Sequence, residues 1–105
     1  MKRFDIYLAN FHPSLGAEIQ KTRPCVILSP NELIKYSNTI LIAPLTSTIK
    51  AWPTRVDTHL NGHDGQIMLQ QIKSFDRRRF IKKLDHLNDE KSQKVCEILQ
   101  ELFAY

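Results

Sequence analysis

The spacing of the apolar residues changes once along the chain, and this change limits the possible folds more than any other feature of the sequence. Phe4, Ile6 and Leu8 recur at every second position, which is the pattern of a strand with one buried face. Further short apolar runs predict strands over residues 25–28, 39–43, 54–59, 66–72 and about 81–84. Together they indicate a small, curled antiparallel sheet of five or six strands.

Residues 61–65 contain Asn-Gly and Asp-Gly dipeptides, which predict a hairpin between two of these strands, and a helical turn is expected around 76–79. Near the C-terminus the apolar spacing becomes that of one helix face, with Val95, Ile98, Leu99, Leu102 and Phe103. Asn88 or Asp89 can cap this helix. The sequence therefore predicts an α+β domain, mainly β, in which a C-terminal helix of about four turns packs on a strongly twisted or barrel-like sheet.

The length and composition are those of one globular domain, 1–105, because 42% of the 105 residues are hydrophobic and 25% are charged. The longest apolar run, 40–45, is far shorter than the roughly 18 to 20 residues of a membrane span. Asp5 interrupts the N-terminus before a signal-peptide core could form, so we expect a cytoplasmic protein without a membrane partner. Cys25 and Cys96 lack the spacing of a zinc site and are predicted to be buried hydrophobes, and no metal or cofactor is expected.

The positive charge of the chain is concentrated in one segment. Residues 73–83 contain six Lys and Arg and one acid, Asp76, for a net charge of +5, whereas the whole chain carries +4. Such a patch favours binding to nucleic acid or to an acidic partner. The alternative, a solvated polar face, remains open from charge alone.

The longest irregular stretch joins the first two strands, over residues 11–24, and loops of this length in compact domains are often functional. It carries Glu18, Lys21 and Arg23. Pro24 restrains the backbone of Arg23 to an extended conformation at the start of a strand. Arg23 is thus a candidate for binding an anion from a rigid element, although an arginine at a strand start is also common on plain surfaces.

A second candidate region begins where a buried strand ends, at Thr46-Ser47-Thr48. Three consecutive hydroxyls can donate hydrogen bonds to a phosphate, or they can satisfy the local backbone in a turn. Just beyond them Trp52 stands between the cations Lys50 and Arg55. This arrangement suits stacking on an RNA base, and it equally suits a half-buried residue at a sheet edge.

Five blocks of residues follow one another in a characteristic order. They are Asp5-Ile6-Tyr7, then Pro13 with Gly16-Ala17-Glu18, then residues 22–29 (TRPCVILS), then Ala43-Pro44-Leu45-Thr46-Ser47, then residues 71–76 (QIKSFD). In this order, from residue 5 to about 87, the chain resembles the MazF/PemK/Kid family of toxin endoribonucleases, also called mRNA interferases. The resemblance implies a small SH3-like barrel with a C-terminal helix, a homodimer, and metal-independent cleavage of single-stranded RNA.

The resemblance also implies roles for individual residues. Arg23 and Thr46 match the catalytic arginine and threonine of the family, and Glu18 matches the acidic residue of the first long loop. Met68 and Gln70 stand where the Kid branch has an Arg and Asp pair, so we carry over the Arg and Thr arrangement. The predicted RNA-binding residues, from the resemblance and from residue chemistry together, are Ser47, Lys21, Lys50, Trp52, Gln71, Lys73 and Arg77.

The chemistry implied by this assignment is self-consistent. RNA supplies its own nucleophile, the 2′-OH, so the protein has to orient it, stabilise charge on the phosphorane and move protons. The products are then a 2′,3′-cyclic phosphate and a 5′-OH. A guanidinium such as that of Arg23 is a bidentate clamp for phosphate oxygens and a poor base, since the pKa of arginine exceeds about 12. The group that accepts the 2′-OH proton stays open at this point, with Glu18 as one candidate, and Arg23 can also deliver a proton to the leaving oxygen.

Two other functions remain open from the sequence. One is a non-catalytic toxin of the same fold that binds a protein target, like the gyrase-poisoning CcdB branch, and the other is a plain nucleic-acid-binding barrel. Arg23 and Thr46 argue against the first, which needs neither residue. The expected partners are single-stranded RNA, a second copy of the chain, and a cognate antitoxin whose acidic, disordered tail competes with RNA for the basic surface.

Overall fold

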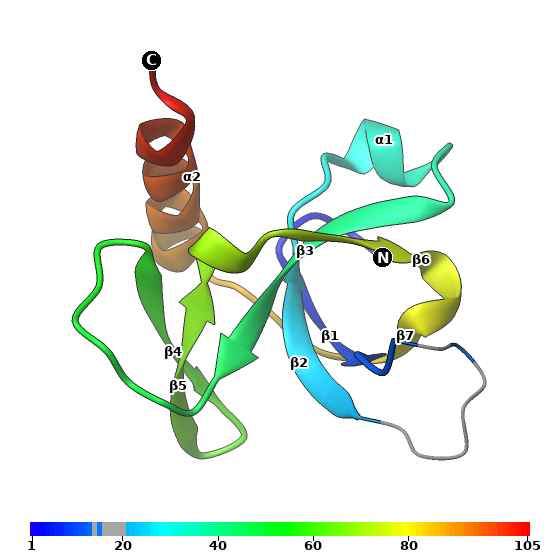
Figure 1. The fold of residues 1–105 in the computed structure, drawn as a ribbon, viewed down its shortest axis with the longest axis horizontal. Helices are drawn as coiled ribbons and strands as arrows, with labels where there is room; N and C mark the ends of the chain where they lie inside the picture. Colours follow the sequence, from blue (N-terminus) through cyan, green and yellow to red (C-terminus); the bar gives the residue numbers. More distant parts are fainter. Residues whose placement is uncertain (14, 16–20) are drawn as a thin grey trace.

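The computed structural model describes residues 1–13, 15 and 21–105, which form a curled antiparallel sheet followed by one long helix (Figure 1). The strands found within these residues are β1 (Asp5–Asn10), β2 (Thr22–Ile27), β3 (Thr39–Thr46), β4 (Arg55–Leu60), β5 (His63–Met68), β6 (Lys73–Asp76) and β7 (Phe80–His86). The helices are α1 (Asn31–Ile34) and α2 (Asp89–Phe103), and Leu69–Gln71 and Arg77–Arg79 form 3-10 turns. The predicted fold class, a mainly β domain with a C-terminal helix, is confirmed.

Strand β3 is shared by the two halves of the sheet. The strand order is β4-β5-β3-β2-β1-β7, and β6 pairs with the same edge of β3 as β5 does, along an earlier stretch of the strand. Residues 39–42 of β3 pair with β6, whereas Leu45 and Thr46 pair with β5. Figure 1 shows the β4–β5 hairpin on one side of the molecule and β1, β2 and β7 on the other, joined by β3. The sheet therefore bends around the end of β3, and this bend positions the site described below.

Pro44 marks the point where β3 changes partner. The sequence predicts that this strand ends before Pro44, which is wrong, because β3 continues to Thr46. Pro44 pairs with Cys25 of β2, and neither β6 nor β5 is paired with it on the other side. Since proline lacks only the N–H donor, it is tolerated where a ladder is interrupted.

Two apolar clusters stabilise the fold. The first lies beneath α2, where the fully buried Val95 packs with the buried side chains Ile6, Val26, Leu28, Ala43, Leu45, Val56, Ile67, Leu69 and Leu87. The second comprises Ala9, Cys25, Ile27, Ile34, Ile40, Ile42 and Phe75, with Tyr7, Phe11 and Phe80 packed against it. The predicted packing of the helix on the sheet is confirmed for Val95, Ile98 and Leu99, but not for Leu102 and Phe103, which are exposed.

The predicted hairpin, the predicted cap of the C-terminal helix and the predicted helical turn around 76–79 are confirmed. Asn61 and Gly62 have positive φ angles of 52° and 79°, which is the geometry of the tight turn that favours this dipeptide. Helix α2 begins after Asn88, whose side chain accepts a hydrogen bond from the Lys91 amide at 2.8 Å. The Arg77–Arg79 turn begins after Asp76, whose carboxylate accepts from the Arg78 amide.

Other element bounds differ from the prediction. The expected strand 66–72 is instead the end of β5 followed by the turn Leu69–Gln71. Strand β6 and helix α1 were not predicted, and both are only four residues long. In β6 the one buried side chain is Phe75, so the strand has no apolar alternation for the sequence to display. In the part of the chain described by the structure, no helix is long and apolar enough to cross a membrane.

Candidate active site

A groove of about 640 Å³ opens between the two halves of the sheet. One wall consists of Leu8, Arg23, Pro24, Lys82 and Leu84 from β1, β2 and β7. The other wall is the β4–β5 hairpin, with Thr58, Leu60, Asn61, His63, Asp64 and Gly65. Residues 45–48, at the end of β3 and just beyond it, close the groove between the two walls.

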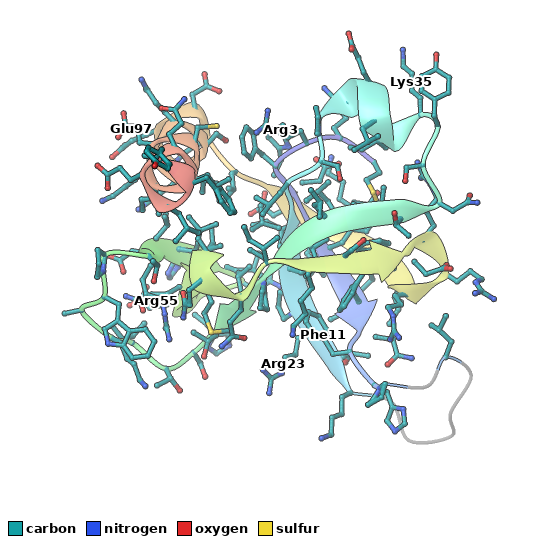
Figure 2. All side chains as sticks on the ribbon, turned by 45° about the horizontal axis from the view of Figure 1, so that its top comes forward. Arg3, Phe11, Arg23, Lys35, Arg55 and Glu97 are labelled. Carbon is teal, nitrogen blue, oxygen red and sulfur yellow. The ribbon has the colours of Figure 1, made fainter. Side chains whose placement is uncertain are left out.

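Arg23 and Thr46 meet at this groove because β2 and β3 are paired. The two strands are in register at Cys25 and Pro44, and continuing that register by two residues brings Arg23 opposite Thr46. Arg23 is exposed, and Figure 2 shows its side chain extending from the start of β2 into solvent. The two residues predicted as the catalytic pair therefore lie side by side at one opening, and their spacing is fixed by the backbone ladder.

The hydroxyl of Thr46 is held by the next turn of chain. Its Oγ1 accepts a hydrogen bond from the Thr48 amide at 3.1 Å. A threonine hydroxyl that accepts from an N–H still has its own proton to donate. The Thr46 hydroxyl therefore keeps a proton that it can donate to a ligand.

The loop that follows Thr46 is fixed by a buried amide. Gln66 of β5 is only 5% exposed, and its Oε1 accepts from the Lys50 amide and the Arg55 guanidinium at 3.0 and 3.1 Å. Its Nε2 donates to the Lys50 carbonyl and to the Asp57 carboxylate at 3.1 and 2.9 Å. Arg55 also donates to the Thr48 carbonyl at 3.0 Å. These bonds tie the loop between β3 and β4 to the sheet and keep the Thr46 turn in place.

Gly65 leaves room for this arrangement. A Cβ atom added at Gly65 would lie 2.8 Å from the Thr46 carbonyl oxygen and 3.5 Å from Thr58 Oγ1. The first distance is too short for any real side chain, so β5 approaches the end of β3 this closely only because residue 65 is glycine. The sequence pattern placed this glycine in the hairpin turn, but it is a strand residue whose role lies at the groove.

Comparison with known proteins places the chain in a family. Residues 2–103 match the family described as PemK-like, MazF-like toxin of type II toxin-antitoxin system. The chain belongs to this family. It is 33% identical over 95% of its length to Endoribonuclease EndoA of Bacillus subtilis, of which it covers 91%. It is 36% identical over 90% of its length to Endoribonuclease MazF of Staphylococcus saprophyticus, of which it covers 84%.

The fold agrees with the solved structures of this family. Crystalline MazF of Deinococcus radiodurans superimposes with a TM-score of 0.81 at 25% identity, over all of this chain and 97% of that one. A MazE–MazF crystal structure from the same organism gives 0.79 at 24% identity, over 97% of this chain and 94% of that one. The sequence-based assignment to the MazF/PemK family is confirmed, and the Bacillus and Staphylococcus relatives are both named as endoribonucleases.

In this MazF-like toxin, Trp52 lies on the loop held by Gln66 and does not line the groove. Lys50 Nζ is 4.4 Å and the Arg55 guanidinium 4.9 Å from the centroid of its ring, and the side chain is 47% exposed. The ring is therefore already in contact with two cations. A base that stacks on Trp52 has to share the ring with them.

The three arginines of the basic segment bind to the protein itself. Arg77 Nε donates to the Ser37 carbonyl at 2.8 Å, and Arg78 pairs with Asp76 at 3.0 Å. The guanidinium of Arg79 lies 5.2 Å from the ring of Phe75 and donates to three carbonyls at the start of the β1–β2 connection, those of Asn10, His12 and Pro13. Two of the six cations of this segment, Arg77 and Arg79, thus join distant parts of the chain, whereas the pair of Arg78 with Asp76 is local and exposed.

The lysines of the same segment are divided between different surfaces. Lys82 lines the groove, whereas Lys83 Nζ lies 3.4 Å from the buried carboxylate of Asp5. The pKa of Asp5 is lowered although burial acts to raise it, because hydrogen bonds from His86 at 2.7 Å and from the Lys2 amide at 2.8 Å stabilise the carboxylate. Asp5 therefore links the N-terminal turn, through the Lys2 amide, to Lys83 and His86 in the second half of β7.

The remaining predicted residues lie in different places. Ser47 lines the groove with Arg23 and Thr46, and Lys21 is exposed one residue before β2 begins. Gln71, Lys73 and Arg77 do not line the groove. Glu18 lies outside the described residues.

The groove residues that were not predicted include Thr58, His63 and Lys82. Only the strand pairing brings them to the groove, and no local motif marks them. Among the described residues no group of three or more His, Cys, Asp or Glu side chains could hold a metal ion. Cys25 is buried, which raises the pKa of its thiol to about 12, whereas Cys96 is only half-buried, so the prediction that both are buried is wrong for Cys96.

Proposed function

We propose that this toxin is an endoribonuclease that cleaves single-stranded RNA through attack of the substrate's own 2′-OH. The observation that carries the proposal is the meeting of Arg23 and Thr46 at the mouth of one groove. A cation and a hydroxyl donor side by side form a binding site for the non-bridging oxygens of a phosphate.

In this mechanism each residue has defined tasks. Arg23 binds the scissile phosphate and stabilises the extra negative charge of the phosphorane, where charge-assisted hydrogen bonds are strongest. Thr46 donates a further hydrogen bond to the same phosphate. We propose Glu18 as the acceptor of the 2′-OH proton. The bond between phosphorus and the 5′-oxygen breaks as the 2′-oxygen attacks, and the leaving 5′-oxygen takes a proton from Arg23, which regains it from solvent. The nucleophile belongs to the RNA and the compensating charge to Arg23, so the proposed reaction uses no metal.

We propose that the active toxin is a homodimer in the cytoplasm. Apolar side chains remain exposed on the sheet and at the helix end, including Leu41, Ile81 and Phe103, and a second copy would cover part of this surface. We further propose that an antitoxin with an acidic, disordered tail neutralises the protein. The solved MazE–MazF complex of Deinococcus radiodurans supports such a partner.

The test is incubation of the purified protein with a mixed RNA in EDTA, followed by analysis of the fragment ends. The proposal requires discrete fragments with 2′,3′-cyclic phosphate and 5′-OH ends. A substrate with a 2′-deoxy nucleotide on the 5′ side of the cut must bind and resist cleavage. Binding of RNA without fragments would instead indicate a nucleic-acid-binding barrel, and neither binding nor fragments would indicate a CcdB-like toxin with a protein target.

A further inference from the structure

The floor of the groove is apolar although its rim is charged and polar. Leu8, Pro24, Leu45, Leu60 and Leu84 all line the groove. Leu8 lies in the middle of one wall, since β1 is flanked by β2 and β7, and Leu45 of β3 lies where the two walls meet; we call the apolar surface that they share the floor. A flat apolar surface of this kind suits the face of a nucleobase better than it suits a phosphate or a sugar.

Two cations line the groove beside this floor. Leu8 pairs with Pro24 on one side and with Lys82 on the other, and directly opposed residues of an antiparallel ladder point to the same face. Lys82 is therefore two strands away from Pro24, about 10 Å at the usual strand spacing. Arg23 directly precedes Pro24, so its side chain leaves the sheet on the opposite face from Pro24, Leu8 and Lys82, and Arg23 lines the groove at its rim, from the start of β2.

One buried hydroxyl at the groove has no partner. Thr58 is 8% exposed, it lines the groove, and its Oγ1 makes no hydrogen bond. Buried polar atoms are nearly always paired, and an unpaired one is costly. A ligand in the groove that carries hydrogen-bonding groups along its edge can supply the missing partner.

We propose that the groove binds one nucleotide of the RNA next to the scissile phosphate held by Arg23. Its base lies on the apolar floor, its far phosphate is bound by Lys82, and Thr58 hydrogen-bonds to the edge of the base. This inference rests on the proposed ribonuclease function and assigns its base-recognition site. Thr58 is then a specificity-determining residue and Lys82 a phosphate contact.

The chain supplies a matched control for Lys82. Lys83 is its neighbour on β7 and carries the same charge, but it pairs with Asp5 and does not line the groove. The probe is a short single-stranded RNA made resistant by a 2′-deoxy nucleotide at the cut, and its affinity is measured as a function of salt. The logarithm of the association constant falls linearly with the logarithm of the salt concentration, and Lys82→Gln should make this slope less steep by about 0.7. At 0.1 M salt this change is about a fivefold loss of affinity. Lys83→Gln should leave the slope unchanged, and equal slopes for the two variants would overturn the assignment of Lys82.

The base site is tested by placing a single abasic nucleotide at each position of the same RNA. The RNA whose abasic nucleotide lies beside the cut should bind about tenfold more weakly than the intact RNA, because only at that position does the base cover apolar surface. Thr58→Val, which keeps the shape of the side chain, should reduce the ratio of kcat/KM between the preferred and the least preferred base at that position by at least fivefold. Thr54→Val serves as the control, since Thr54 bonds to Gln70 outside the groove.

An even loss over all abasic positions, or an unchanged base preference in Thr58→Val, would overturn the inference. These outcomes are distinct from failure of the proposed function. The affinity measurements need no cleavage, and wild-type protein that binds but does not cut RNA would refute the ribonuclease function alone.

Discussion

The closest steric constraint on the active site is Gly65, so replacing Gly65 by alanine tests the site directly. The new Cβ would lie 2.8 Å from the Thr46 carbonyl oxygen, whereas ordinary contacts begin near 3.4 Å. The end of β3 therefore has to move by about 0.6 Å. Overpacking of this kind costs about 1 to 3 kcal/mol, which lowers the Tm of a domain this size by roughly 5 to 20 °C. Because misplacement by about 1 Å can cost 10²-fold in rate, we expect kcat to fall about tenfold.

Gly62→Ala is the matched control in the same hairpin. It has nothing within 4 Å of the added Cβ, but a positive φ of 79°, so it is strained by about 1 to 2 kcal/mol without displacing Thr46. The assay is single-turnover cleavage of a defined RNA well below both melting temperatures. Gly62→Ala should lose stability and keep kcat, and Gly65→Ala should lose both. A Gly65→Ala protein with the kcat of the wild type would show that the position of Thr46 does not limit the reaction.

Three further outcomes follow from the contacts of single residues. Arg23→Ala should lower kcat by about 10²-fold or more, and Thr46→Val should lower it by less. The melting temperatures of both variants should stay within a few degrees of wild type. Full cleavage by Arg23→Ala would refute the role of Arg23 in stabilising the phosphorane. The lowered pKa of Asp5 predicts that its contribution to stability is present above about pH 4 and is lost as the pH falls below that value. In Asp5→Asn the free energy of unfolding, measured with urea, should therefore fall less steeply as the pH is lowered. Arg79→Lys keeps the charge but cannot reach three carbonyls at once, so it should loosen the start of the β1–β2 connection and lower kcat about 10- to 100-fold. Arg78→Lys should leave kcat unchanged, because Arg78 pairs only with Asp76. Equal kcat values for the two variants would show that Arg79 does not hold this connection in place.

The elements that the sequence predicted well are those whose apolar spacing is read locally. Strand β1 and helix α2 each bury one face, and the spacing of their apolar residues reports it directly. The turn at Asn61 and Gly62 was equally visible, because only a few residue types accept a positive φ. Strand β6 was missed for the opposite reason, since four residues with one buried side chain give no period.

The site was predicted in part because its two central residues have strong local signals. Arg23 precedes a proline at a strand start, and Thr46 ends a buried strand, and both lie at the groove. Lys82 had no such signal, because it reaches the groove through its pairing with Leu8, which is 74 positions away in the sequence. The role of Arg79 was likewise hidden, since its partners are backbone carbonyls that any residue could provide.

The position of the active site follows from the change of partner along β3. Up to Ile42 the strand is held by β6 on one side, and from Leu45 onward by β5, so the sheet must bend between these residues. β2 remains paired with β3 at this bend, as the pair between Cys25 and Pro44 shows. The bend therefore opens a groove between the hairpin and the other strands without separating Arg23 from Thr46. A site built in this way depends on how closely the paired backbones approach each other. Gly65 sets this approach at the end of β3, because a Cβ atom there would lie 2.8 Å from the Thr46 carbonyl oxygen.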